Sequence, residues 1–254
     1  MLEKWEITIP ELTGEEERNA YVYVPEGYEE DVRFPVLYMF DGHNLFDDEE
    51  ATYGKSWGML DYLEETHIPL IVAAVECSHH DEDEECGGRL SEYSPFDFKS
   101  RHWGEIKGRG KLTMDFYTRD FKSYIDANYP TLPQREYTFI SGSSMGGLMS
   151  LYALIEYNDV FSKAAALSPS IGFCPKDVTN MIRNSNVDKN TVLYMDYGEQ
   201  EFRYKRIREI YGKTCAELMK KGILLQSRIV PGGFHSEASW EKQIPFFMDV
   251  FFYE

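Results

Sequence analysis

Cysteine is scarce in this sequence, and no pair of cysteines has the spacing of a metal site. The 254 residues include four cysteines, Cys77, Cys86, Cys174 and Cys215, with no Cys-x-x-Cys motif among them. This distribution argues against a zinc ribbon and against a disulfide framework. We therefore expect reduced thiols that serve no metal.

The sequence also lacks a long apolar run. Its first residues, Met1-Leu2-Glu3-Lys4-Trp5-Glu6, have neither the basic start nor the apolar core of a signal peptide. No later segment approaches the apolar length of a membrane helix. We expect a cytoplasmic protein with no membrane partner.

Positive charge is in short supply. Lysine and arginine together number 26 against 44 aspartates and glutamates, which gives a formal net charge of −18. Such a surface repels phosphate backbones and anionic lipid headgroups, so it argues against binding of nucleic acid or of a membrane surface. A small-molecule partner fits this charge better.

Cofactor motifs are absent as well. The run Gly108-Arg109-Gly110-Lys111 lacks the full phosphate-loop pattern and follows no predicted strand, so we interpret it as a flexible loop. The charged run from His79 to Cys86 is typical of a solvated surface rather than of a metal cluster. We expect no cofactor and no metal. No oligomeric state is predicted, because the sequence does not show the surface on which an interface would lie.

What the sequence does contain is an alternation of strand-like and helix-like segments. Hydrophobic residues make up 43% of the chain, which is typical of an ordered globule. With no internal repeat or low-complexity linker, residues 1–254 are predicted to form one α/β domain with a mostly parallel sheet of about eight strands and helices on both faces. The first two strands, with no helix predicted between them, should form an antiparallel hairpin at the edge. The predicted strands are Trp5–Ile9, Ala20–Val24, Val36–Phe40, Ile71–Val75, Tyr137–Ile140, Ala164–Leu167, Val192–Met195 and Leu224–Val230, and the clearest helices are Leu112–Ala127, Met145–Glu156, Arg203–Lys221 and Trp240–Phe252.

The segment 77–111 shows little periodicity. A loop of this length inside a compact domain usually serves function, and we predict a partial lid or a substrate wall there, with a plain surface excursion as the alternative.

The most informative motif is Gly142-Ser143-Ser144-Met145-Gly146, which lies between a predicted strand and a predicted helix. In such Gly-x-Ser-x-Gly turns the small flanking residues let a strained backbone lift the serine hydroxyl clear of the sheet. The motif nominates Ser144 as a nucleophile. It also aims the N–H of Met145 at the position where an oxyanion would form.

A serine nucleophile needs a base, and a base needs an acid that holds it in the correct tautomer. The only histidine after Ser144 is His235, which lies in a Gly-rich turn beyond the last predicted strand. Three carboxylates follow the strand before it, Asp196, Glu199 and Glu201, and their positions alone leave the choice open. The order nucleophile, acid, histidine is the order expected of α/β-hydrolases.

The second oxyanion donor should lie in the loop after the third strand. There Gly42 would let the backbone turn so that the N–H of His43 faces Ser144. The His43 ring could instead act as a rival base, but its place in this loop favours backbone donation. Asp41 is expected to stabilise the turn through its side chain.

Five motifs in this order resemble the putative-esterase family of α/β-hydrolases, and the resemblance extends from about Trp5 to Phe252. That group includes feruloyl and other carbohydrate-acyl esterases, S-formylglutathione hydrolases, enterochelin-type siderophore esterases and mycolyltransferases. The motifs are Asp41-Gly42-His43-Asn44-Leu45-Phe46, Arg89-Leu90-Ser91-Glu92-Tyr93-Ser94-Pro95, Gly142-Ser143-Ser144-Met145-Gly146-Gly147, Leu167-Ser168-Pro169-Ser170 and Pro231-Gly232-Gly233-Phe234-His235.

The resemblance implies an α/β-hydrolase fold and a serine esterase of small acyl esters, with carbohydrate-acyl or hydroxycinnamoyl esters favoured. It places the acid three residues after Gly198, at Glu201, although many relatives carry Asp there and Glu199 and Asp196 stay as alternatives. Alternative activities are a siderophore trilactone esterase, an S-formylglutathione-type thioesterase and an acyltransferase with the same triad. A non-catalytic binding protein is the remaining alternative.

Substrate contacts are expected from side chains in the loops around the nucleophile. Aromatic walls suit sugars, hydroxycinnamoyl groups and catecholate rings alike, although each aromatic residue could equally fill the core. The residues expected to contact substrate are Asn44, Tyr93, Phe173 and Trp240.

Overall fold

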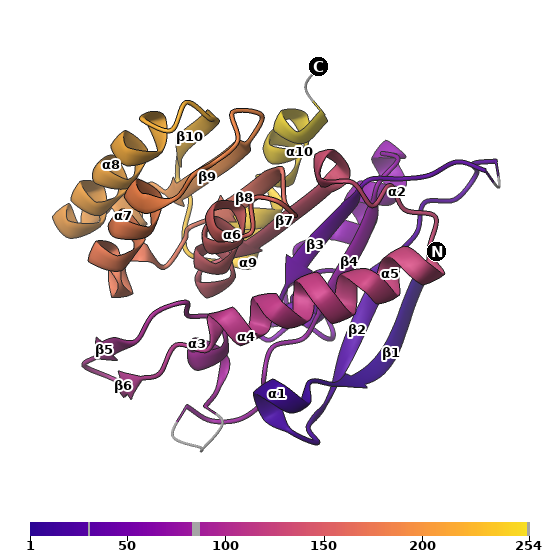
Figure 1. The fold of residues 1–254 in the computed structure, drawn as a ribbon, viewed down its shortest axis with the longest axis horizontal. Coiled ribbons are helices and arrows are strands. Elements are labelled where there is room, and N and C mark those ends of the chain that lie inside the picture. Colours follow the sequence, from indigo (N-terminus) through magenta and orange to yellow (C-terminus); the bar gives the residue numbers. More distant parts are fainter. Residues whose placement is uncertain (30, 83–86, 253–254) are drawn as a thin grey trace.

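A computed structural model describes residues 1–29, 31–82 and 87–252, and its centre is an eight-stranded sheet (Figure 1). The two N-terminal strands pair antiparallel with each other, and β2 is antiparallel to β4, whereas all later pairings in this sheet are parallel. This is the mostly parallel α/β arrangement that the sequence predicts. In their order across the sheet the strands are β1 (Leu2–Thr8), β2 (Glu17–Tyr23), β4 (Ile71–Val75), β3 (Val36–Phe40), β7 (Thr138–Ser143), β8 (Lys163–Leu167), β9 (Val192–Gly198) and β10 (Leu224–Val230).

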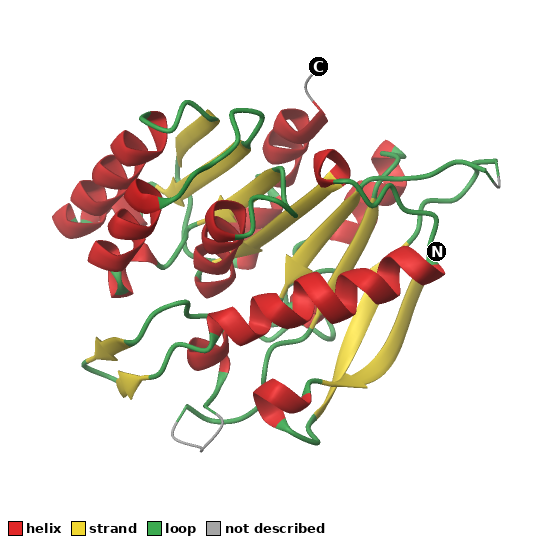
Figure 2. Ribbon diagram, viewed as in Figure 1, coloured by secondary structure: helices red, strands yellow, loops and turns green. Residues whose placement is uncertain are grey.

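Helices cover both faces of the sheet because its central strands are apolar on both sides. In β3, for example, Val36, Tyr38 and Phe40 face one apolar layer, and Leu37 and Met39 face the other. The first layer is completed by α1 (Pro10–Thr13), α4 (Gly110–Asp115), η2 (Phe116–Phe121), α5 (Lys122–Asn128), α6 (Met145–Glu156), α7 (Pro175–Asn184) and α8 (Lys205–Met219). The second is completed by α2 (Met59–Thr66), α9 (Glu237–Glu241) and α10 (Ile244–Phe252). Figure 2 shows the two helical layers with the sheet between them.

The N-terminal hairpin forms at the sheet edge as predicted, with the short helix α1 in its connection, which the sequence did not predict. The predicted closing helix is divided into α9 and α10. Pro245 causes the division, because proline has no N–H to donate to the preceding turn and restricts Ile244 before it.

The segment 77–111 contains more structure than its sequence pattern indicates. It includes the short helix α3 (Arg89–Glu92) and a two-stranded hairpin of β5 (Phe98–Ser100) and β6 (Gly104–Ile106). Figure 1 shows this hairpin projecting beside the end of α4, away from the main sheet. The side chain of Phe98 stacks on Phe173 with ring centroids 4.6 Å apart. The last residues of the predicted charged run, 83–86, lie outside the described residues, and Cys86 is one of them.

No helix in the described ranges is both long enough and apolar enough to span a membrane.

Candidate active site

Ser144 lies at the turn between β7 and α6, with a backbone conformation that few side-chain-bearing residues adopt. Its φ is 57° and its ψ is −117°. Such strain costs of order 1–3 kcal/mol and persists only where neighbouring contacts fix the chain. The Ser144 N–H donates to the carbonyl of Leu167 at 2.9 Å, and a Cβ on Gly142 would lie 2.8 Å from the backbone of Gly146. The motif glycines therefore allow two backbones to meet at this turn.

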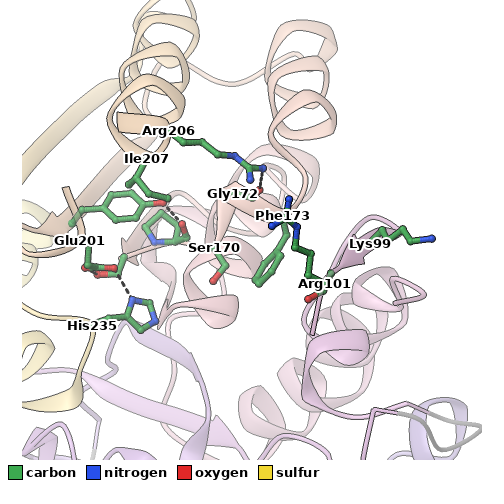
Figure 3. Close-up of a pocket in the computed structure, with 13 residues that line it drawn as sticks. Lys99, Arg101, Ser170, Gly172, Phe173, Glu201, Arg206, Ile207 and His235 are labelled. Atoms are coloured by element: carbon green, nitrogen blue, oxygen red, sulfur yellow. Dashed lines mark hydrogen bonds and ion pairs between the residues drawn. The ribbon is translucent and has the colours of Figure 1, made fainter. Parts of the chain in front are cut away.

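The nucleophile candidate, the histidine and one of the three candidate acids form a continuous hydrogen-bonded line. Ser144 Oγ lies 2.9 Å from His235 Nε2, and His235 Nδ1 lies 2.6 Å from Glu201 Oε2. Glu201 begins the short helix η5 (Glu201–Arg203) after β9, and His235 follows β10. Because these strands are parallel neighbours, their carboxyl ends bring both side chains to the same edge as Ser144. Figure 3 shows Glu201 and His235 facing each other.

Glu201 is held as a carboxylate. Its second oxygen, Oε1, accepts hydrogen bonds from Ser168 Oγ at 2.6 Å and from the Gly198 N–H at 2.8 Å. Burial opposes ionisation of this group, but the hydrogen bonds from His235, Ser168 and Gly198 outweigh burial and hold the pKa of Glu201 below its usual value. An ionised acid at this position orients the imidazole and stabilises its charged form.

The other two candidate acids have different partners. Asp196 is buried in β9, where Tyr194 Oη donates to it at 2.8 Å and the Ser168 N–H donates at 3.2 Å. Burial raises the pKa of Asp196 to about 7. Glu199 accepts from the Gly232 N–H at 2.8 Å. Glu199 thus joins the loops that carry Glu201 and His235, whereas Asp196 anchors the turn at Ser168 after β8.

The loop after β3 turns toward the nucleophile through an unusual backbone conformation at Asp41, whose φ is 59°. Arg89 holds this residue with two hydrogen bonds, of 2.6 and 2.7 Å, to the two carboxylate oxygens. Burial opposes ionisation of Asp41, but Arg89 holds its pKa below the usual range. A Cβ on Gly42 would lie 2.7 Å from the Tyr21 ring, so only glycine fits at this turn.

The ring of the next residue, His43, contacts a threonine and lines the same cavity as Ser144. Its Nε2 lies 3.0 Å from Thr52 Oγ1, and burial lowers the pKa of the ring. Within the described part of the chain no group accepts a hydrogen bond from the His43 N–H. Met145 is the first residue of α6, where a helix leaves its N–H without an intrahelical acceptor. Both N–H groups are thus available as donors beside Ser144.

A second hydroxyl lies against that of Ser144, and the sequence analysis predicted no role for it. Ser170 Oγ is 3.3 Å from Ser144 Oγ, and the Ser170 N–H donates to the Ser144 carbonyl at 2.9 Å. The signal for this residue was the motif Leu167-Ser168-Pro169-Ser170, which places it just beyond the carboxyl end of a predicted strand.

Two cavities meet at His235. The first has a volume of about 690 Å³ and includes Phe173, Ser170 and Glu201 in its lining, and the second, of about 790 Å³, includes Ser144, Asn44 and Trp240. Three of the residues expected to contact substrate, Asn44, Phe173 and Trp240, therefore line a cavity. The structure places Tyr93 beneath the site instead, fully buried against Phe40, where its hydroxyl accepts from the Asp41 N–H at 3.2 Å.

One group of potential metal ligands lies beside the site. Donor atoms of Asp41, His43 and Cys77 lie within 4.8 Å of one another. Both oxygens of Asp41 are engaged by Arg89, and burial raises the pKa of the Cys77 thiol well above its usual value. A cation would compete with a guanidinium for the carboxylate and would need a thiolate that burial disfavours. These residues fit an ion pair better than a metal.

A mostly parallel sheet with a nucleophile turn, an acid and a histidine at the carboxyl ends of its strands defines the α/β-hydrolase fold. The model of the family described as "Putative esterase" matches residues 12–246, so the chain belongs to that family, as the motifs indicate. Family membership confirms the predicted carboxylic-ester hydrolase.

The chain is also similar to a bacterial protein in sequence and to several solved structures in fold. The uncharacterized protein YbbA of Bacillus subtilis (strain 168) is 24% identical over 194 residues, which cover 74% of this chain and 71% of that protein. The BES protein from Bacillus cereus has a TM-score of 0.73 at 18% identity, over 100% of this chain and 95% of its own. The enterobactin and salmochelin hydrolase IroE has a TM-score of 0.71 at 18% identity, over 99% of this chain and 95% of its own. A ferulic acid esterase has a TM-score of 0.67 at 15% identity, over 99% of this chain and 98% of its own. These structures share the fold with this chain.

Proposed function

We propose that this hydrolase acts through an acyl-enzyme with Ser144 as nucleophile, His235 as general base and Glu201 as the acid that orients it. The observation that carries the proposal is the line of contacts from Ser144 Oγ to His235 at 2.9 Å and on to Glu201 at 2.6 Å. In acyl transfer these three groups activate a hydroxyl that is otherwise a weak nucleophile.

In the first half of the proposed reaction, Ser144 Oγ attacks the ester carbonyl while His235 Nε2 takes the hydroxyl proton. The backbone N–H groups of His43 and Met145 donate to the oxyanion that forms. His235 then returns the proton to the departing alcohol, which leaves the acyl group on Ser144. In the second half, water attacks the acyl-enzyme by the same steps and releases the acid.

The substrates that we propose are small acyl esters of carbohydrates or of hydroxycinnamic acids. Phe173 in the first cavity and Trp240 in the second are aromatic surfaces of the kind that bind sugar and phenyl rings. The similarity of the fold to a ferulic acid esterase supports this class.

A siderophore trilactone is a second candidate, because the fold is also similar to a hydrolase of enterobactin and salmochelin, with a TM-score of 0.71 against 0.67 for the ferulic acid esterase. An S-formylglutathione-type thioester and acyl transfer to an alcohol would use the same three residues. The two cavities that share His235 in their linings leave room for a larger ester.

Replacement of the nucleophile tests this mechanism. We expect Ser144→Ala to lower kcat for 4-nitrophenyl butyrate by at least about a thousandfold, as loss of a triad serine does, with an unchanged circular dichroism spectrum. Ser185→Ala, a change at the C-terminal end of α7, serves as the matched control and should keep wild-type activity. Turnover that survives in Ser144→Ala would refute the assignment.

The substrate class is tested on the same pair of proteins with mass-spectrometric product detection. The panel holds methyl ferulate, acetylated xylo-oligosaccharide, S-formylglutathione and a trilactone siderophore, each with and without an acceptor alcohol. Preference for either of the first two supports the proposed class. Preference for the trilactone or the thioester, or a new ester formed with the acceptor, would replace it with the corresponding alternative.

A further inference from the structure

The two cavities that meet at His235 differ in the charges that line them. Among the described residues, the lining of the 690 Å³ cavity includes three cations and a single carboxylate, Glu201, which is engaged by His235. The lining of the 790 Å³ cavity includes four carboxylates, Asp41, Glu50, Glu76 and Glu237, and one guanidinium group, Arg89, which is paired with Asp41. In a chain with a net charge of −18, a cationic cavity next to the nucleophile is a local reversal of the overall field.

Two of the three cations, Arg101 and Arg206, have donors to spare. Arg101 lies in the turn between β5 and β6, and within the described part of the chain it has neither an ion-pair nor a hydrogen-bond partner. Arg206, in the first turn of α8, makes one hydrogen bond, to the carbonyl of Gly172 at 2.9 Å. Figure 3 shows both side chains extending toward Gly172 and Phe173. Lys99 instead points away and pairs with Glu105 at 3.1 Å.

The cavity wall next to these guanidinium groups includes two large apolar side chains, with the Ser170 hydroxyl nearer the triad. Phe173 and Ile207 line the cavity, and Phe173 is fixed from behind by its stacking on Phe98. An apolar or planar arm of a substrate would pack on this surface and lose little by leaving water. A polar end group would then reach the guanidinium groups of Arg101 and Arg206.

We infer that this cavity selects esters in which one arm ends in a carboxylate, which Arg101 and Arg206 bind. This inference rests on the proposed function, because it names the substrates of that same triad. The planar guanidinium fork donates two parallel hydrogen bonds to a carboxylate. A phosphate, with nearly twice the charge, fits less well, because the acidic surface of the protein repels it more strongly.

The test compares matched ester pairs that differ only in the end group. For the acyl arm these are the 4-nitrophenyl monoester of glutaric acid and 4-nitrophenyl valerate, and for the alcohol arm they are 4-butyryloxybenzoate and its methyl ester. The proteins are wild type, Arg101→Gln, Arg206→Gln and the double variant. Arg119→Gln removes the same charge from an exposed site outside both cavities and is the matched control.

The quantity compared is the ratio of kcat/KM for the charged ester to kcat/KM for the neutral ester of the same pair. For one of the two pairs, we expect each single variant to lower this ratio by about tenfold, mostly through a higher KM for the charged ester. The double variant should lower it further, and 0.5 M salt should weaken the wild-type preference. Arg119→Gln should leave the ratio unchanged. A ratio that stays within twofold of wild type in the double variant, for both pairs, would overturn the inference.

Binding separates this inference from the proposed function. If wild type hydrolyses none of these esters, the proposed function fails, and calorimetry with the glutarate monoester on Ser144→Ala still decides the cavity's role. Binding that is lost when Arg101→Gln and Arg206→Gln are added upholds carboxylate recognition. Absent binding, or binding that survives both changes, rejects it.

Discussion

At the scale of single residues, the most informative contact is the one between two serines. Ser170 Oγ lies 3.3 Å from Ser144 Oγ, the proposed nucleophile, and Ser170 lines the first cavity. The backbone bond from Ser170 N–H to the Ser144 carbonyl fixes the two residues relative to each other. The Ser170 hydroxyl thus restricts the rotation of the Ser144 side chain toward His235, and we regard it as a positioning residue.

Ser170→Ala tests this role. One hydrogen bond of this type contributes about 1 kcal/mol, so we expect kcat for 4-nitrophenyl butyrate to fall about fivefold. KM should stay within twofold, because the hydroxyl acts on the nucleophile rather than on the substrate. Steady-state kinetics measures both values. A changed KM with an unchanged kcat would instead make Ser170 a substrate contact.

At the scale of elements, the loop after β3 depends on α3, a helix from a distant part of the chain. Arg89 of α3 binds both oxygens of Asp41, whose side chain is 6% exposed. Tyr93, just after α3, accepts from the Asp41 N–H. The position of the His43 N–H is therefore set by contacts across about 48 residues of sequence.

Arg89→Met should expose this dependence. A buried carboxylate left without its partner costs about 3–5 kcal/mol, so we expect the free energy of unfolding to fall by that order. Loss of one oxyanion donor lowers kcat about a hundredfold or more. Urea unfolding and 4-nitrophenyl butyrate kinetics measure the two effects.

The double variant Arg89→Met with Asp41→Asn separates stability from positioning. It leaves no unpaired charge, so part of the lost stability should return while kcat stays low. Full recovery of kcat would show that Arg89 does not hold the oxyanion loop.

The sheet and the main helices could be predicted because their signals are local. Apolar runs such as Val36–Phe40 and the helical stripe of α6 need no distant information. The hairpin of β5 and β6 could not be predicted, because its strands have three residues each and its anchor, Phe173, lies about 75 residues away. Glu201 was chosen by resemblance and not by its local sequence. Which of three nearby carboxylates reaches His235 depends on the pairing of β9 with β10.

At the scale of the whole molecule, one buried acid couples stability to pH. Asp196 lies near the carboxyl end of β9, the strand next to the edge of the sheet, is 1% exposed and has a pKa of about 7 because burial disfavours its charge. This pKa is higher than that of an unfolded aspartate, so the folded state binds more protons between about pH 4 and pH 7. The stability that the protonated group contributes is present at low pH and is lost as pH rises through about 7.

Asp196→Asn should remove this dependence. Between pH 4.5 and 7 we expect the free energy of unfolding of wild type to fall relative to the variant, by up to about 1.4 kcal/mol per pH unit. Urea unfolding of both proteins at each pH measures the difference between their free energies of unfolding. Groups that titrate alike in the two proteins cancel in this difference. Parallel curves for the two proteins would mean that Asp196 stays ionised in the fold.

The hairpin of β5 and β6 stands apart from the main sheet and is attached to the site through the stack of Phe98 on Phe173. It carries one wall of the first cavity, whereas Ser144, Glu201 and His235 come from the ends of β7, β9 and β10. One of the two guanidinium groups proposed to bind substrate, that of Arg101, is therefore carried by a segment separate from the proposed triad. Insertions or replacements at the hairpin tip can change which esters are accepted without moving the triad, so this segment is the natural place to graft a new specificity onto the scaffold.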